Sequence, residues 1–235
     1  MLYDGLENGK TVVSPSKNMT EVAAMNFIKR CAALIIGIVI VSFGTSLTIQ
    51  AAIGVGAYDA MALSVSYITG IKVGTISMVA NGTCILLQLL IEKRDFKLIQ
   101  LLQIGLVLLQ GAVVNFFVYT VFADWKIVHY ITRIPVLAAG YITIAFGITV
   151  IMRSDIIRNP LEGVSQLIAD KRGKPMGRLR QQWDIAFVLI ALSLAFFSRT
   201  AFTIREGTIL GMLLFGPFLD LFKKPVGALY TKAGL

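Results

Sequence analysis

Two acidic residues, Asp59 and Glu162, each occupy the third position of a short predicted helix. The positive end of the helix dipole stabilises a carboxylate there, so simple helix capping explains the placement. In an apolar chain the same carboxylates could bind a proton, a cation or a substrate amine, because acids within membrane segments are costly and usually functional. We therefore treat both as candidate substrate-binding residues.

Local signals define the second of these helices over residues 160–172. Asn159 is a favoured N-cap, Pro160 is tolerated at N1, and Glu162 at N3 completes a capping-box-like pair. Gly173 can adopt the left-handed conformation that ends a helix. At about 1.5 Å per residue, this helix is only about 20 Å long. It is too short to cross a hydrocarbon core of about 30 Å, although apolar segments that can cross lie on both sides of it.

The first short helix, over residues 57–69, follows Gly56 and belongs to an internal repeat. A shift of 103 residues, which places Phe43 on Phe146, overlays the two segments without a gap. The shift pairs Gly44 with Gly147, Asp59 with Glu162, Gly70 with Gly173, Gly74 with Gly177, and Asn81 with Asp184. After a two-residue insertion, Gly111 pairs with Gly216 and Asn115 with Asp220. The sequence therefore predicts a duplicated unit whose hinge or cap positions are Gly54, Gly70, Gly74, Pro160, Gly173 and Gly177.

Composition sets the class of protein. The 235 residues are 56% hydrophobic and only 15% charged, whereas soluble domains carry about 25% charged residues. Several runs of about 20 apolar residues indicate transmembrane helices. We predict an all-α polytopic membrane protein with six spans, at 31–50, 73–91, 98–122, 134–152, 182–198 and 204–222. The predicted units are a flexible N-terminus (1–25), repeat one (26–122), a linker (123–133), repeat two (134–224) and a disordered tail (225–235).

The distribution of basic residues predicts the orientation. With the amino end inside, the inner segments hold four Lys or Arg residues before the first span, three at 93–97, seven at 153–180 and three after 222. The outer segments hold five. This bias predicts an inner (cytoplasmic) cell membrane location with both termini cytoplasmic. Because each unit has three spans, the second must be inverted relative to the first, so the short helices enter from opposite sides. Inverted repeats with broken helices are common in secondary transporters, and the space between the short helices is the expected site.

Further polar residues fall within the predicted spans. Asn81 and Asp184 form the next matched pair of candidate ligand contacts, although interhelical hydrogen bonds, or an ion pair of Asp184 with Arg178 or Arg180, explain them as well. Asp220 is expected to pair with the lysines that follow it. The third span carries a polar stripe of Gln100, Gln103, Gln110 and Asn115, which either packs against neighbouring helices or walls a pathway.

Other chemistries find no support in the sequence. Cys31 and Cys84 lie within apolar spans and indicate neither a disulfide nor a metal site. His129 has no metal partner at a useful spacing, and no nucleophile–base pair or phosphate-binding loop is present. We therefore expect no enzyme activity, no cofactor and no nucleic-acid partner. The basic cluster at 171–180 is expected to contact anionic lipids at the inner face.

The motifs Gly54-Val55-Gly56-Ala57-Tyr58-Asp59-Ala60 and Thr69-Gly70-Ile71-Lys72-Val73-Gly74-Thr75 resemble those of the YczE/YyaS/YitT-type small bacterial membrane proteins. The second half, with Asn159-Pro160-Leu161-Glu162-Gly163, is similar to that group's repeated copy. The resemblance covers about residues 31–224 and implies a bacterial membrane protein presumed to transport. It departs at Ala57, where the group has Pro, and at Tyr58, where it has Trp, which implies an altered ligand contact there. The predicted substrate-binding residues are Gly56, Tyr58, Asp59, Asn81, Asn159, Glu162 and Asp184.

These observations predict a secondary transporter of a small polar metabolite, with a cationic metabolite as one option, that works by alternating access between inverted repeats. Two other classes remain open at this stage. One is a substrate-binding membrane subunit of a multi-component uptake system, which would co-purify with an ATPase. The other is a channel or a non-transporting scaffold, distinguished by flux that does not saturate or by no flux at all. A homodimer is one option for the assembly.

Overall fold

A computed structural model describes residues 17–93, 96 and 98–232, and these residues are helical or connecting segments with no strand among them. The helices in chain order are α1 (Lys17–Ala51), α2 (Ala57–Thr69), α3 (Val73–Glu92), η2 (Leu98–Leu101), α4 (Leu102–Phe116), η3 (Phe117–Val121), α5 (Tyr130–Ser154), α6 (Pro160–Arg172), α7 (Met176–Ser198) and α8 (Glu206–Lys232). The short helices α2 and α6 have the bounds that the sequence predicted.

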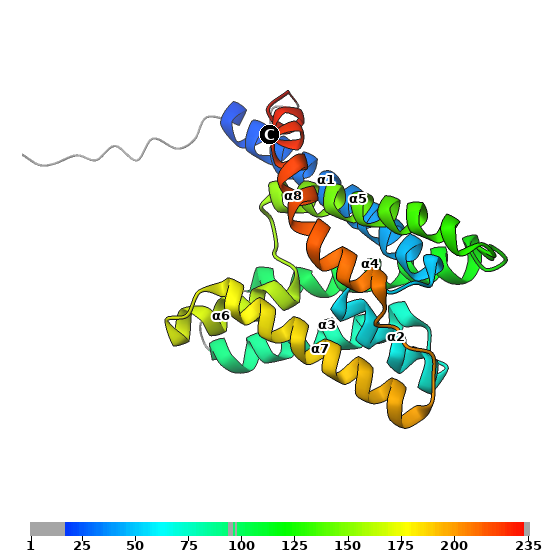
Figure 1. Ribbon diagram of the computed structural model, residues 1–235. Helices are drawn as coiled ribbons and strands as arrows, with labels where there is room; N and C mark the ends of the chain where they lie inside the picture. The colour runs from blue at the N-terminus through cyan, green and yellow to red at the C-terminus, as the bar shows by residue number, and fades with distance from the viewer. Residues whose placement is uncertain (1–16, 94–95, 97, 233–235) are drawn as a thin grey trace, which may run out of the picture.

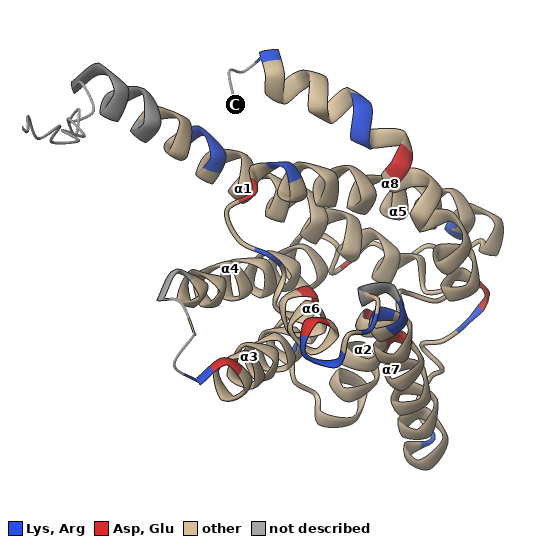
Figure 2. Ribbon diagram, turned by 90° about the vertical axis from the view of Figure 1, so that its left-hand side faces the viewer, with Lys and Arg blue, Asp and Glu red and all other residues tan. Residues whose placement is uncertain are grey.

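The helices form two groups, one above the other in Figure 1. Helices α1, α5 and α8 pack together in one group, and α2, α3, α6 and α7 pack in the other. Helix α4 contacts both α1 and α3 and so joins the two groups. Seen from the side of α6, basic residues gather on the α6–α7 turn and near the ends of α1, α3 and α8 (Figure 2).

Five of the described helical segments are long and apolar enough to cross a membrane: Met25–Ala51, Val73–Glu92, Leu102–Val121, Tyr130–Ser154 and Arg178–Ser198. Many of their large apolar side chains are exposed, as expected of surfaces that face lipid. The protein is therefore a helical protein that inserts into membranes. Helix α8, where the sequence predicts a sixth span, is not among the five. It carries Glu206, Asp220, Lys223 and Lys224, and the sixth span stays a prediction.

Helices α1 and α5 approach closely at four glycines, Gly37, Gly44, Gly140 and Gly147. A Cβ atom added at Gly44 would lie 2.9 Å from the carbonyl oxygen of Gly140, and one at Gly147 would lie 3.0 Å from that of Gly37. Small residues allow such close packing of membrane helices. The contacts are reciprocal, because a shift of 103 converts Gly37 into Gly140 and Gly44 into Gly147.

Helices begin earlier and end later within the described residues than the sequence predicted. Of the segment 1–25, predicted to be flexible, residues from Lys17 onward belong to α1, and residues 1–16 lie outside the described part. The expected disordered tail 225–235 is wrong as far as Lys232, because α8 continues through Pro225. Tertiary packing overrides the proline: Val226 is fully buried, and the Tyr230 hydroxyl donates a hydrogen bond of 2.8 Å to the carbonyl oxygen of Val150. The linker is also shorter than 123–133, since α5 begins at Tyr130.

These contacts predict that the C-terminal residues contribute to stability. Deleting residues 226–235 removes the buried Val226 side chain and the hydrogen bond of Tyr230. We expect a loss of roughly 2–4 kcal/mol in the free energy of unfolding, from about 1.5–3 kcal/mol for a buried valine and about 1 kcal/mol for a hydrogen bond. Thermal unfolding in a fixed detergent measures it, and deletion of 233–235 alone is the control. A truncated protein as stable as the full chain would contradict the prediction.

Candidate solute cavity and its closed counterpart

A cavity of about 270 Å³ lies between the end of α3, η2 with the start of α4, the segment before α6, and α6 itself. Seven of its eleven lining residues have polar or charged side chains, and the residues come from four segments: Gln88 and Glu92; Gln100 and Gln103; Ile156, Ile157 and Arg158; and Gly163, Gln166, Leu167 and Asp170. We call it the open cavity. Its position matters because α6 is one of the two helices too short to cross a membrane.

Two buried glutamines form the floor of the open cavity. Gln88 and Gln103 are only 2% and 4% exposed. The Gln88 Nε2 group donates to Oε1 of Gln103 at 3.3 Å and to the carbonyl oxygen of Pro160 at 2.9 Å. The hydrogen bond to Pro160 connects Gln88 to the first residue of α6. Gln88 therefore ties α3 to both α4 and α6 at the base of the cavity.

Three charged residues, Glu92, Arg158 and Asp170, also line the cavity. Glu92 accepts a long hydrogen bond of 3.4 Å from Nε2 of Gln100. Its other carboxylate oxygen, Oε2, is buried and has no hydrogen-bond partner within the described part of the chain. Asp170 accepts a hydrogen bond of 2.6 Å from Nε2 of Gln166, and Arg158 is exposed at the edge. The lining residues therefore include two carboxylates and one guanidinium.

The matching positions at the other end of the molecule are closed. Subtracting 103 from Ile156, Ile157, Gly163 and Leu167 gives Ile53, Gly54, Ala60 and Ser64, all of them buried. The segment before α8 fills the space beside them. Thr203 donates a hydrogen bond of 3.1 Å to the carbonyl oxygen of Ala60 and lies 2.8 Å from the Ser64 hydroxyl. The backbone N–H of Gly207 donates to the carbonyl oxygen of Ile53 at 2.8 Å. We call this packed region the closed counterpart.

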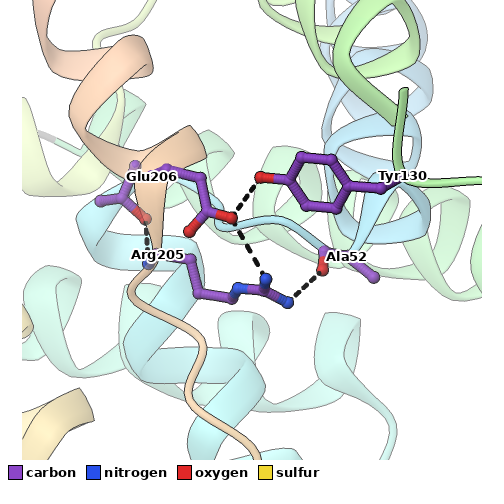
Figure 3. Close-up of polar contacts among 5 residues, drawn as sticks. Ala52, Tyr130, Arg205 and Glu206 are labelled. Atoms are coloured by element: carbon purple, nitrogen blue, oxygen red, sulfur yellow. Dashed lines mark hydrogen bonds and ion pairs between the residues drawn. The ribbon is translucent and has the colours of Figure 1, made fainter. Parts of the chain in front are cut away.

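A polar cluster of Arg205, Glu206, Tyr130 and Ala52 covers the closed counterpart (Figure 3). Arg205 donates hydrogen bonds to the carbonyl oxygen of Ala52 and to the carboxylate of Glu206, each at 3.1 Å, and the Tyr130 hydroxyl also donates to Glu206. The cluster thus joins the end of α1 and the start of α5 to the start of α8.

The predicted substrate-binding residues do not line the open cavity. Tyr58 and Asn81 contact each other, since Nδ2 of Asn81 donates to the Tyr58 hydroxyl at 2.8 Å, and Tyr58 in turn donates to the carbonyl oxygen of Ser77 at 3.0 Å. Asp59 is half-buried and has no hydrogen bond or ion pair to another described residue; Arg180 is its electrostatic partner. Asp184 pairs with Arg180 at 3.5 Å, as one of the sequence interpretations expected.

Asn159 and Glu162 lie beside the cavity without being part of its wall. The Asn159 side chain caps α6 by accepting a hydrogen bond of 3.2 Å from the N–H of Leu161, as predicted. A capping box also needs a hydrogen bond from the Asn159 backbone N–H to the Glu162 side chain. Both residues are described, and this bond is absent between them. Gly56 precedes α2 without any side-chain cap.

The predicted hinge or cap positions have several roles. Gly70 and Gly173 end α2 and α6 in the left-handed conformation, and Gly54 has a φ of 111°. Gly74 lies one residue inside α3, where a Cβ atom would be 2.2 Å from the carbonyl oxygen of Gly111. Gly177 lies in the first turn of α7, and its surroundings are outside the described details.

The space between the starts of the two short helices is apolar. Ala57 of α2 and Leu161 and Val164 of α6 share one cluster with Cys84 and Phe187. The expected site between the short helices is thus filled by side chains, and the cavity lies on the other side of α6. The sequence interpretation missed Gln88 and Glu92, whose counterparts at a shift of 103 residues are the apolar Ala191 and Ala195. The signal that could have found the cavity was the polar stripe, because both Gln100 and Gln103 line it.

The helical architecture of the described residues, with five helices long and apolar enough to cross a membrane, defines the class of protein: a helical membrane protein. Within that class the chain belongs to a family of unknown function, DUF6198, whose sequence model matches residues 28–224. Comparisons with curated proteins and with solved structures found no match.

Proposed function

We propose that this protein is a membrane transporter of small polar solutes that exposes its binding site to one side of the membrane at a time. The observation that carries the proposal is the contrast between the open cavity and its closed counterpart. The same positions of the repeat surround a polar space of about 270 Å³ at one end and are packed against Thr203, Gly207 and Thr208 at the other. Transporters built from inverted repeats bind their substrates in such a site and open its two ends in turn.

The contacts of α1 and α5 support the inverted repeat. A two-fold relation between two segments requires that contacts be reciprocal, so that residue i meets j and the partner of j meets the partner of i. The glycine contacts of α1 and α5 follow this rule with a shift of 103. On this view α8 is the sixth span, and α2 and α6 are the broken helices of the two repeats.

The orientation in this proposal follows from the charge bias. The open cavity is lined by Glu92 and Asp170, which directly precede in the sequence the basic segments 93–97 and 171–180. The positive-inside rule places these segments in the cytoplasm, so the cavity faces inward, in an inner membrane with both chain ends cytoplasmic. The basic residues there would contact anionic lipids. The resemblance to YczE/YyaS/YitT-type proteins agrees with this proposal and stays a prediction.

The size of the cavity limits the solute. Sites for drug-sized ligands measure about 300–1,000 Å³, so a cavity of about 270 Å³ suits a small metabolite. A substrate-binding subunit of a larger uptake system is the second candidate, because the cavity has polar walls and its counterpart is closed. Co-purification with an ATPase would favour that candidate.

Labelling of two matched cysteine variants tests the proposal. Leu167→Cys places a thiol in the open cavity and Ser64→Cys places one at the matching closed position, both in a Cys31→Ser, Cys84→Ala background. A membrane-impermeant maleimide is applied to right-side-out and inside-out vesicles. We expect Leu167→Cys to react from the cytoplasmic side at least ten times faster than Ser64→Cys reacts from either side, since the Ser64 side chain is fully buried.

Two results would contradict the proposal. Reaction of both thiols at similar rates from opposite sides would indicate a continuous channel. Failure of Leu167→Cys to react from either side in folded protein would show that the cavity is not accessible from water. A Phe197→Cys variant, on an exposed apolar position of α7, controls for thiols that face lipid.

A further inference from the structure

The hydrogen bonds around the open cavity leave it rich in acceptors. Two of its glutamines, Gln88 and Gln166, donate their amide N–H groups to protein oxygen atoms. An amide whose nitrogen is used in this way presents its oxygen to the remaining space. Gln88 is 2% exposed, and no described residue donates to its Oε1 atom, which lies beside Gly163 at the cavity wall. A solute at this wall therefore meets an acceptor.

The charged residues that line the cavity also favour a positively charged solute. Glu92 and Asp170 carry two negative charges, and Arg158 carries the one positive charge among the lining residues. Arg158 and Asp170 are exposed at the edge, whereas one oxygen of Glu92 is buried without a hydrogen-bond donor within the described residues. A buried carboxylate is costly unless it is paired. A positively charged solute that reaches the glutamine floor would lower this cost.

The floor also offers one donor. Nε2 of Gln103 has no acceptor among the described residues, and Gln103 is 4% exposed. The acceptors outnumber this one donor, so the cavity as a whole suits a small group that carries many N–H bonds better than it suits an anion. A guanidinium or primary ammonium group fits this pattern, because it has donors only.

We propose that the open cavity selects small organic cations, whose guanidinium or ammonium group is held by Oε1 of Gln88 and the carboxylate of Glu92. This inference rests on the proposed function and names the substrate class of the same site. Asp170 attracts the cation at the entrance, and the volume of about 270 Å³ restricts the solute to a few heavy atoms beyond the charged group.

Three planar solutes of nearly equal shape test the charge class: guanidinium, urea and nitrate. Each is added at millimolar concentration to Leu167→Cys protein in lipid nanodiscs, and protection of the thiol against maleimide is measured. Hydrogen bonds to a charged group are strong enough to give a preference of roughly 10- to 100-fold. We therefore expect guanidinium to protect at a concentration at least ten times lower than urea, and nitrate to give no protection.

Two variants distinguish the roles of Glu92 and Asp170. Glu92→Gln keeps the shape of the side chain and removes its charge, so guanidinium should then protect no better than urea. Asp170→Asn should weaken protection by guanidinium about threefold. If Glu92→Gln does not fold, Asp170→Asn alone tests the role of the acidic residues. Asp220→Asn is the matched control, because Asp220 lies on the surface of α8 in an ion pair of 2.6 Å with Lys223. It should leave the preference unchanged.

The outcomes distinguish this inference from the proposed function. Equal protection by guanidinium and urea, or stronger protection by nitrate, would overturn the charge class while leaving a solute cavity in place. A preference for guanidinium that survives Glu92→Gln would overturn the role of Glu92. No protection by any of the three solutes would overturn the inference, and the side from which Leu167→Cys reacts would still decide the proposed function.

Discussion

Replacing Gly74 by alanine is expected to destabilise the protein by about 3 kcal/mol or more. The added Cβ atom would lie 2.2 Å from the carbonyl oxygen of Gly111 and 2.7 Å from Oδ1 of Asn115. The first neighbour is backbone, so α3 and α4 would have to separate. Their separation would also break the hydrogen bond of 2.8 Å that Asn115 accepts from the N–H of Gly74. Overpacking usually costs 1–3 kcal/mol, and a clash with backbone lies at the upper end of that range.

A second glycine in the same helix supplies the control. A Cβ atom at Gly82 would meet no atom within 4 Å, so Gly82→Ala should change stability by less than about 1 kcal/mol, towards greater stability because alanine favours helices. Equilibrium unfolding of both variants in one mixed micelle system measures the difference. Equal stability of Gly74→Ala and wild type would show that α3 and α4 are not in contact at this point.

The replacement Gly54→Ala is expected to open the closed counterpart. A Cβ atom at Gly54 would lie 2.8 Å from both the backbone nitrogen and the hydroxyl of Thr208, and the φ of 111° is reserved for glycine. Strain of this kind costs about 1–3 kcal/mol, and the clash adds to it. Because the contact exists only while α8 packs on Gly54, the cost falls on the closed arrangement. A penalty of about 2 kcal/mol corresponds to roughly a 30-fold change in the equilibrium between closed and open arrangements.

The readout is the labelling of Ser64→Cys in the Gly54→Ala background. We expect the thiol to become reactive from the outer side and the reaction of Leu167→Cys from the cytoplasmic side to slow. Gly70→Ala is the control, because Gly70 also has a positive φ, of 72°, but its Cβ position is free of neighbours within 4 Å. It should lower stability without changing either labelling rate. If Gly54→Ala leaves Ser64→Cys unreactive while the protein stays folded, the closed counterpart does not open.

Local signals in the sequence predicted the short helices well. The N-cap Asn159, the proline after it and Gly173 act over a few neighbouring residues, and α6 has the predicted bounds with the predicted capping bond. The same reasoning gave α2 its bounds, because Gly70 ends it in the left-handed conformation. Signals of this kind need no knowledge of the rest of the chain.

The cavity could not be predicted in the same way. Gln88 reaches the carbonyl oxygen of Pro160, 72 positions further along the chain, and only the packing of α3 on α6 brings the two together. The predicted repeat directed attention to Asp59 and Glu162, which a shift of 103 residues pairs. The cavity residues Gln88 and Glu92 correspond to Ala191 and Ala195, so the polar site is a feature of one half alone. The end of α8 was mispredicted for a related reason, since Pro225 looks like a helix end until Val226 is seen to be buried.

Helix α8 is fixed at its two ends to different parts of the protein. Its first turn contacts Gly54 through Thr208, and its last turns contact α5 through Val226 and Tyr230. Pro217 lies between them and has no N–H to complete the helical ladder, so bending there breaks no hydrogen bond of its own. Movement of the first half would require breaking the polar cluster around Arg205, the contacts with Gly54, and the hydrogen bonds of Gly207 with Ile53 and Tyr141. The second half of α8, after Pro217, would stay packed on α5.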